Sequence, residues 1–173
     1  MNNRLEKSLV GACGVFYVSA ELTRRGWIAL PTIRNTSGVD IIASKDNKTV
    51  NIQVKTNSYG KAVYPLSEGN ETLVSDNLYY VFATLRMENE RPDFYIVPSK
   101  FVAEYIRKTH KQWASLPPRH KKVAYEGATQ KEIEEKRDKR SLRRFPNYVG
   151  ATLSEFRDFN IGNYKDKWDI LES

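Results

Sequence analysis

The sequence is poor in the residues that build disulfides and histidine or cysteine metal clusters. Among 173 residues there is one cysteine, Cys13, and there are two histidines, His110 and His120. A single cysteine excludes an internal disulfide and a cysteine-based zinc cluster. Two histidines leave almost no room for a multi-histidine metal site. Disulfide scaffolds and zinc-cluster proteins are therefore excluded.

Long apolar runs are also missing. No stretch approaches the roughly 18 apolar residues that a membrane-spanning helix needs, and the first ten residues lack the basic-then-apolar layout of a secretion signal. Apolar residues make up 40% and charged residues 28% of the chain, which is ordinary for a globular protein. We therefore expect a cytoplasmic protein of one compact domain with an appended C-terminal part.

Positive charge is concentrated in one segment. The net charge is +7, but residues 100–148 hold 14 basic and 6 acidic residues, a balance of +8. The densest part is residues 131–144, KEIEEKRDKRSLRR. A local positive field attracts polyanions, of which nucleic acid is the commonest, and Lys139, Arg140, Arg143 and Arg144 are the candidate phosphate contacts. The alternative is a solvated helix face with mixed i,i+4 charge pairs.

The order of local patterns predicts an α/β domain around a mixed sheet. We expect helices over residues 5–25, 100–108, 131–144 and 153–159, strands over residues 27–33, 39–43, 49–56, 78–85 and 93–97, and a long loop over residues 58–75. Pro31 marks the first strand as an edge strand.

Several residues are expected to define the ends and faces of these elements. Leu9, Cys13, Phe16 and Ala20 recur at helical spacing and predict the apolar stripe of the first helix. Ser99 and Thr129 are candidate N-caps. The apolar residues near the end of the chain, Trp168, Ile170 and Leu171, are expected to anchor it.

The informative stretch is residues 37–56. Asp40 follows a glycine-containing turn, and the polar turn Lys45–Lys48 predicts a hairpin. Because residues i and i+2 of a strand share a face, Gln53 and Lys55 point together, and the hairpin brings Asp40 to the same end of the sheet. A lone Asp more often caps a turn, and a lone Gln/Lys pair more often lies on the solvent-exposed face of a strand. A functional site is therefore predicted only because the three residues are expected to meet.

This grouping suits a hard divalent cation. Mg²⁺, with Mn²⁺ as a substitute, takes oxygen ligands and keeps several waters. Asp40 supplies a carboxylate, Gln53 an amide oxygen and Val54 its backbone carbonyl. Lys55 is placed to orient or help deprotonate a water that attacks a phosphodiester.

The stretch resembles the PD-(D/E)xK nuclease superfamily, which has the restriction-endonuclease-like fold. The resemblance rests on Gly38-Val39-Asp40 and Gln53-Val54-Lys55-Thr56 after a first helix that ends at Gly26. The chain also resembles a group of small bacterial proteins with a GVD…QVKT core and a YYVF…FYIVPS strand pair, here within residues 79–99. The resemblance covers residues 5 to 110.

The resemblance implies a four- or five-stranded mixed sheet flanked by helices and a Mg²⁺-dependent DNA endonuclease. It implies that Asp40 is a metal ligand, that Gln53 occupies the usually acidic position, and that Lys55 is the catalytic lysine. It also implies an acidic residue on the first helix. Glu21 is the best candidate, although the family acid commonly lies about two turns before the helix end, nearer Val15. Many nucleases of this fold act as dimers, so a homodimer is an open expectation.

Two positions depart from the family pattern. Val39 replaces a proline, and Gln53 replaces Asp or Glu, which removes a negative charge from the metal site. The first alternative is therefore a nucleic-acid-binding module that keeps the fold without cleavage, and a second is a toxin, immunity or other interaction protein that uses the same scaffold. We expect residues 1–115 to form the nuclease-like core and residues 116–173 to form a basic helical extension packed on it.

Overall fold

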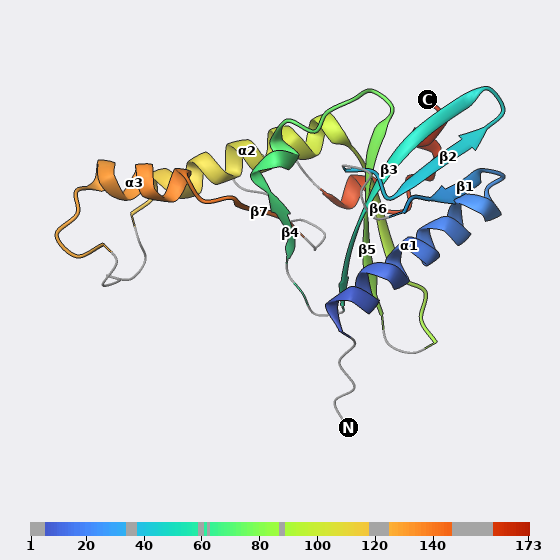
Figure 1. The fold of residues 1–173 in the computed structure, drawn as a ribbon, viewed down its shortest axis with the longest axis horizontal. Coiled ribbons are helices and arrows are strands. Elements are labelled where there is room, and N and C mark those ends of the chain that lie inside the picture. Colours follow the sequence, from blue (N-terminus) through green and yellow to red (C-terminus); the bar gives the residue numbers. More distant parts are fainter. Residues whose placement is uncertain are drawn as a thin grey trace.

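The structure is a computed structural model that describes residues 6–33, 38–58, 61, 63–86, 89–117, 125–146 and 161–173. Its centre is a five-stranded mixed sheet of order β1-β2-β3-β5-β6 (Figure 1). The strands are β1 (Ile28–Pro31), β2 (Ile41–Lys45), β3 (Lys48–Ser58), β5 (Leu78–Leu85) and β6 (Asp93–Pro98). A second, two-stranded sheet joins β4 (Val63–Ser67) to β7 (Leu142–Pro146). The helices are α1 (Lys7–Arg24), α2 (Ser99–Ser115) and α3 (Gln130–Asp138), with short 3-10 turns η1 (Glu68–Glu71), η4 (Ile161–Tyr164) and η5 (Trp168–Leu171).

The predicted mixed sheet flanked by helices is confirmed. β1, β2 and β3 are antiparallel neighbours, β3 and β5 are parallel, and β5 and β6 are antiparallel. The β2–β3 hairpin turns at the predicted tight turn, where Asp46 has a positive φ of 54°. The run LYYVFATL is fully buried along β5, as expected for a central strand covered on both faces.

Each face of the sheet has its own apolar core. On one face, Val18 and Leu22 of α1 pack with Ile52 and Val54 of β3. On the other face, α2 and the β4–β7 sheet cover the aromatic side chains of β5 and β6. Trp168 and Leu171 belong to the α1-side core, which confirms the predicted anchor near the chain end. None of the described helices is long and apolar enough to cross a membrane.

The predicted apolar stripe of the first helix is wrong. The residues of α1 that are buried are Val10, Gly14, Val18 and Leu22, whereas Leu9 is 53% and Phe16 is 69% exposed. The helix carries apolar residues on two faces. The face that can approach the sheet closely is the one that is buried. A Cβ on Gly14 would overlap the side chain of Thr56 on β3, so this glycine marks the face on which helix and sheet touch.

The segments before β5 and after α3 also differ from the prediction. The expected loop over residues 58–75 contains β4 and η1, and the expected basic helix over residues 131–144 ends at Asp138. Arg143 and Arg144 lie on β7 instead, which pairs with β4 in the register Tyr64↔Phe145. The second half of α2 and α3 together project from the body of the molecule and form an arm (Figure 1).

The cap predictions had different outcomes. Thr129 caps α3 in a capping box with Glu132, as predicted. Ser99 does not cap α2: its hydroxyl exchanges hydrogen bonds with the backbone of Ser75, and α2 extends well past Lys108 to Ser115. The helix expected over residues 153–159 lies outside the described residues.

Candidate active site

The candidate site lies where β2 begins and β3 continues past it. The β2–β3 ladder runs from Lys45↔Lys48 to Ile41↔Ile52, while β3 extends to Ser58. Asp40 directly precedes β2. Its backbone N–H donates to the Ile52 carbonyl at 2.8 Å, and its carbonyl accepts from the N–H of Thr32 at 2.9 Å. These two bonds fix the Asp40 backbone between the neighbouring strands.

The Asp40 carboxylate takes the place of the backbone carbonyl that one more residue of β2 would offer to β3. Its Oδ2 accepts a hydrogen bond from the backbone N–H of Val54 at 2.8 Å. The N–H and C=O of one residue in a strand point toward the same neighbouring strand. The Val54 carbonyl therefore opens on the same edge as Asp40, beyond the end of the ladder. The structure thus places the Asp40 carboxylate against the backbone of Val54, and the role of the two residues as metal ligands stays a prediction.

Lys55 is half-buried, and Asp40 is near enough for its charge to act on the lysine. Burial lowers the pKa of Lys55, and the nearby negative charge of Asp40 opposes part of that shift. In the β3–β5 ladder Lys55 is opposite Phe82, whose ring stacks on Phe145 with centroids 4.3 Å apart. Lys55 therefore stands at the margin of the aromatic core that covers this face of the sheet.

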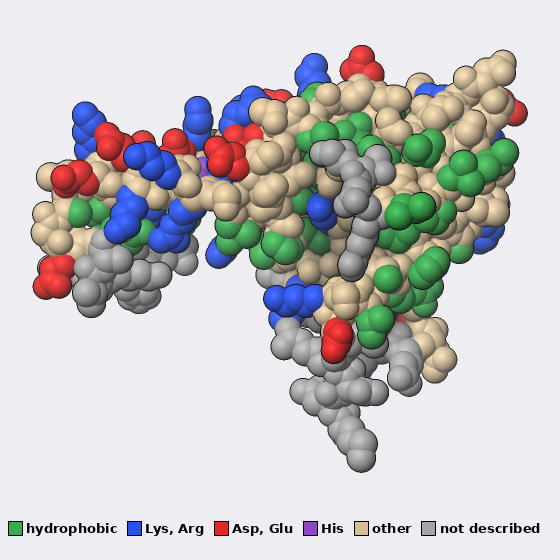
Figure 2. All heavy atoms as spheres, viewed as in Figure 1, with side chains coloured by type: hydrophobic (Ala, Val, Ile, Leu, Met, Phe, Trp, Pro, Cys, Tyr) green, Lys and Arg blue, Asp and Glu red, His purple; other side chains and the backbone are tan. Residues whose placement is uncertain are grey.

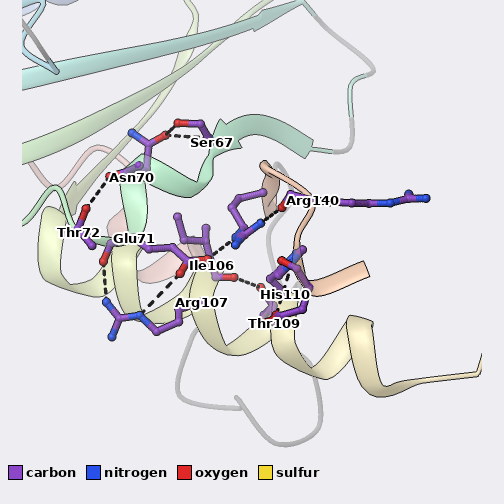
Figure 3. Close-up of polar contacts among 12 residues, drawn as sticks. Ser67, Asn70, Glu71, Thr72, Ile106, Arg107, Thr109, His110 and Arg140 are labelled. Carbon is purple, nitrogen blue, oxygen red and sulfur yellow. Dashed lines mark hydrogen bonds and ion pairs between the residues drawn. The ribbon is translucent and has the colours of Figure 1, made fainter. Parts of the chain in front are cut away.

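Gln53 lies on the same face of β3 as Lys55, and a hydrogen bond from Asn70 holds its side chain. Its side chain is buried, and its Oε1 accepts from Nδ2 of Asn70 at 3.1 Å. The same Nδ2 donates to the hydroxyl of Tyr80 at 3.0 Å. Asn70 Oδ1 accepts from the backbone N–H of Ser67 at 2.8 Å (Figure 3). With its oxygen used at Ser67, Asn70 presents its NH2 to Gln53, so the Gln53 oxygen is an acceptor for that NH2.

Asn70 borders the candidate site through its hydrogen bond to Gln53, and the sequence did not predict this contact. It lies in the segment expected to be a loop, and its capping box with Ser67 holds η1 in place. The signal was present as a Ser followed three residues later by an amide side chain, a variant of the capping-box pattern. No local pattern, however, places that box above β3.

Glu21 is drawn into an ion-pair network of its own. Its carboxylate pairs with Arg24 and Arg91 at 3.2 Å, and also with Arg25. Burial alone would raise the pKa of Glu21, but the hydrogen bonds and charges of Arg91 and Arg25 hold it at about 2. Among the described residues the structure gives Glu21 these arginine contacts and none with Asp40 or Lys55. Its catalytic role stays a prediction.

The four predicted phosphate-binding residues fall into two groups. Arg143 is 4% exposed, pairs with Glu71 and donates to the backbone carbonyl of Arg140. Lys139, Arg140 and Arg144 are exposed. Arg143 is therefore held within the fold, and phosphate contact stays a prediction for the three exposed residues.

The oxygen atoms at the site fit a lightly held Mg²⁺. Within the described part of the chain, no cluster of three or more His, Cys, Asp or Glu side chains could hold a metal. Mg²⁺ needs no such cluster, because it commonly binds through one or two carboxylates, with waters and substrate phosphates as the other ligands. Asp40 has a second carboxylate oxygen, and the Val54 carbonyl faces the same edge. One lone pair of the Gln53 oxygen is used by Asn70, so its role as a ligand stays a prediction.

Comparison with known proteins identifies the fold. No family model matches the chain, and no curated protein matches it. Among solved structures, a bacterial homing endonuclease, I-Ssp6803I, superposes with a TM-score of 0.51 and 12% identity over 98% of this chain and 94% of that chain. The Holliday junction resolvase Hjc of Archaeoglobus fulgidus gives a TM-score of 0.40 and 16% identity over 53% of this chain and 74% of that one. The first likeness shows the restriction-endonuclease-like fold that the sequence predicted.

Proposed function

We propose that the protein is a Mg²⁺-dependent nuclease that hydrolyses phosphodiester bonds of DNA. The observation that carries the proposal is the meeting of Asp40, the Val54 backbone and Lys55 at the end of the β2–β3 ladder. The fold shared with a homing endonuclease supports it. A carboxylate, a carbonyl and an amine at one strand end are the groups that metal-assisted phosphodiester hydrolysis needs.

Each residue has a separate part in this proposal. Mg²⁺ bound by Asp40 and the Val54 carbonyl would supply positive charge that offsets the charge of the phosphate. Asp40 is fixed for this part because its other oxygen is tied to the Val54 N–H. Lys55, with a pKa lowered by burial, holds the attacking water and accepts or shares its proton. Gln53, locked by Asn70, positions the phosphate or adds a neutral ligand.

One observation favours a second candidate, a nucleic-acid-binding protein without cleavage. The position that is usually acidic carries Gln53, and its oxygen is already bonded to Asn70. The site then has one carboxylate, Asp40, which binds Mg²⁺ less strongly than two. In this candidate the same face of the protein contacts nucleic acid, and Lys55 contributes a phosphate contact.

A cleavage assay separates the two candidates. Supercoiled plasmid, single-stranded DNA and branched DNA are incubated with the protein in Mg²⁺, in Mn²⁺ and in EDTA. The nuclease predicts products in either metal and none in EDTA. Lys55→Ala should abolish cleavage and leave DNA binding largely intact. The matched control is Lys48→Ala, at the turn end of the same strand, which should cleave normally.

Two outcomes of the assay decide against the nuclease. Cleavage that persists in Lys55→Ala removes the catalytic assignment. DNA binding with no product on any substrate or metal supports the binding protein instead.

A further inference from the structure

A cavity of about 240 Å³ lies in the angle between the arm and the outer face of the β4–β7 sheet. Its walls include Tyr105 and Trp113 of α2, Arg144 and Leu142 of β7, and Arg140 just before β7. The space-filling view shows the hollow between the projecting arm and the body of the molecule (Figure 2). The cavity thus combines aromatic and aliphatic walls with two guanidinium groups.

The two arginines at this cavity stand apart from the other arginines that the structure describes. The described arginines that pair with a carboxylate are Arg24, Arg25, Arg86, Arg91, Arg107 and Arg143. Arg137 is buried and donates to backbone carbonyls of Trp113 and Leu116. Arg140 and Arg144 are exposed and, within the described residues, pair with no acidic side chain.

Arg140 and Arg144 are positioned to receive an anion. Arg140 donates to the hydroxyl of Tyr125 at 3.1 Å and lies over the Trp113 ring, with its Cζ 5.5 Å from the ring centroid. Figure 3 shows its side chain extending away from the cluster around Glu71. Arg144 lies on the outer face of β7, opposite Pro65 of β4. A guanidinium without a carboxylate partner is suited to forked hydrogen bonding with a phosphate.

We propose that this cavity binds one unpaired nucleotide of a nucleic-acid strand. The base lies between Trp113 of α2 and the apolar side chains Leu142 and Pro146, and its phosphate lies against Arg144 and Arg140. Aromatic stacking with basic contacts to the backbone is how proteins hold single strands without reading their sequence. The charge of the cavity, positive with no acidic wall among its lining residues, matches such a ligand.

The cavity adjoins the strand that carries the candidate catalytic lysine. Val63 lines the cavity, and its carbonyl accepts a hydrogen bond from Asn57 Nδ2 at 2.7 Å. Asn57 follows Lys55 by two residues on β3 and shares its face. The cavity and the candidate site are therefore linked through the Asn57–Val63 hydrogen bond between β3 and β4. The proposal takes nucleic acid as the partner from the proposed function, but it does not require cleavage.

The test measures binding in the Lys55→Ala protein, so that the result does not depend on hydrolysis. A fluorescein-labelled hairpin duplex with one bulged nucleotide is compared with the same hairpin without the bulge. The cavity predicts tighter binding of the bulged hairpin. Leu142→Glu should lower the ratio of the two affinities by roughly fivefold or more, the range of one lost base stack. Arg144→Ala, which removes a phosphate contact, should also lower that ratio. Leu142 is 50% exposed, so Leu142→Glu introduces repulsion without disturbing the core.

The matched control is Lys111→Ala, an equal loss of charge at an exposed position of α2 outside the cavity. It should weaken both hairpins equally and leave their ratio unchanged. Tryptophan emission gives an independent reading, because Trp27 and Trp168 are buried while Trp113 is 36% exposed. The bulged hairpin should quench this emission, and Trp113→Phe should remove the quenching.

Three outcomes would overturn the proposal. Equal affinity for bulged and plain hairpins would show that no unpaired nucleotide is captured. An unchanged ratio in both Arg144→Ala and Leu142→Glu would move the binding elsewhere. Adenosine monophosphate that binds alone as tightly as the bulged hairpin would assign the cavity to a free nucleotide. The two proposals fail separately. The cleavage assay tests the catalytic role of Lys55, and the ratio of affinities for the bulged and plain hairpins tests the cavity.

Discussion

Asn70 donates a hydrogen bond from its Nδ2 to the Oε1 of Gln53 at 3.1 Å. Its own oxygen is held by Ser67, so the direction of this bond is fixed. The bond is compatible with a carboxylate at position 53, because a carboxylate oxygen can accept it equally well. The second oxygen of that carboxylate would then occupy the place of the Gln53 NH2. The structure at position 53 is therefore suited to an acidic residue, although the chain carries an amide.

Gln53→Glu should strengthen Mg²⁺ binding. Asn70 would keep its acceptor, and the new oxygen would add negative charge to the strand whose Val54 backbone binds Asp40. We expect roughly a tenfold lower dissociation constant for Mg²⁺, about 1.4 kcal/mol, measured by calorimetric titration of the protein without DNA. Gln130→Glu on α3 adds the same charge away from the site and should leave the titration unchanged. An unchanged titration in Gln53→Glu would mean that position 53 does not face the metal.

Gly14→Ala should destabilise the protein, in contrast to Gly11→Ala on the same helix. A Cβ at position 14 would overlap Thr56, whereas a Cβ at position 11 would meet no atom within 4 Å beyond its chain neighbours and the backbone of its own helix. Overpacking of this kind costs about 1–3 kcal/mol, while alanine in an exposed helix interior gains about 0.5–1 kcal/mol over glycine. Urea unfolding measures both free energies of unfolding. Equal stability of the two variants would show that Gly14 is not a point of close contact between α1 and β3.

The contrast at α1 shows what local sequence can and cannot predict. Apolar residues occur on both faces of the helix, so hydrophobic spacing alone chose the face of Leu9 and Phe16. The buried face is set by the small residue Gly14, whose lack of a side chain lets the helix approach β3. Spacing of apolar residues carries no information on such a contact, because a glycine contributes none of the signal.

The position of Asp40 next to the backbone of Val54 was predictable because its geometry is local. The short turn between β2 and β3 sets their register, and that register brings Asp40 beside Val54 and Lys55. The β4–β7 sheet was not predictable, since its strands are far apart in the sequence and contain Pro65, Arg143 and Arg144. Strand preference depends on the neighbour across the sheet, and that neighbour is supplied only by the folded chain. Asn70 was missed because its contacts with Gln53 and Tyr80 are also made only in the folded chain.

Glu21→Gln should flatten the loss of stability in acid. The arginines around Glu21 hold its folded pKa at about 2, below the ordinary value of 4.5. A lowered carboxyl pKa contributes stability that is complete above the unfolded value and is lost as the pH falls from about 4.5 to about 2. Thermal unfolding between pH 6 and pH 2.5 should show a shallower decline in Glu21→Gln than in the unaltered protein. Parallel declines would show that the arginine network does not act on Glu21 in solution.

Arg143→Ala should lower the free energy of unfolding far more than Arg144→Ala does, although the two residues are neighbours. Arg143 is 4% exposed and pairs with Glu71, whose side chain is 16% exposed. Among the residues that the structure describes, removing the arginine leaves that carboxylate with the more distant Arg107, at 3.9 Å, as its one cationic partner. Breaking a buried ion pair costs about 3–5 kcal/mol, whereas an exposed substitution changes stability by about 0.5 kcal/mol or less. Urea unfolding should show this difference, and the salt dependence of DNA binding should respond to Arg144 alone. Equal stabilities, or a salt slope that changes only with Arg143, would reverse the two assignments.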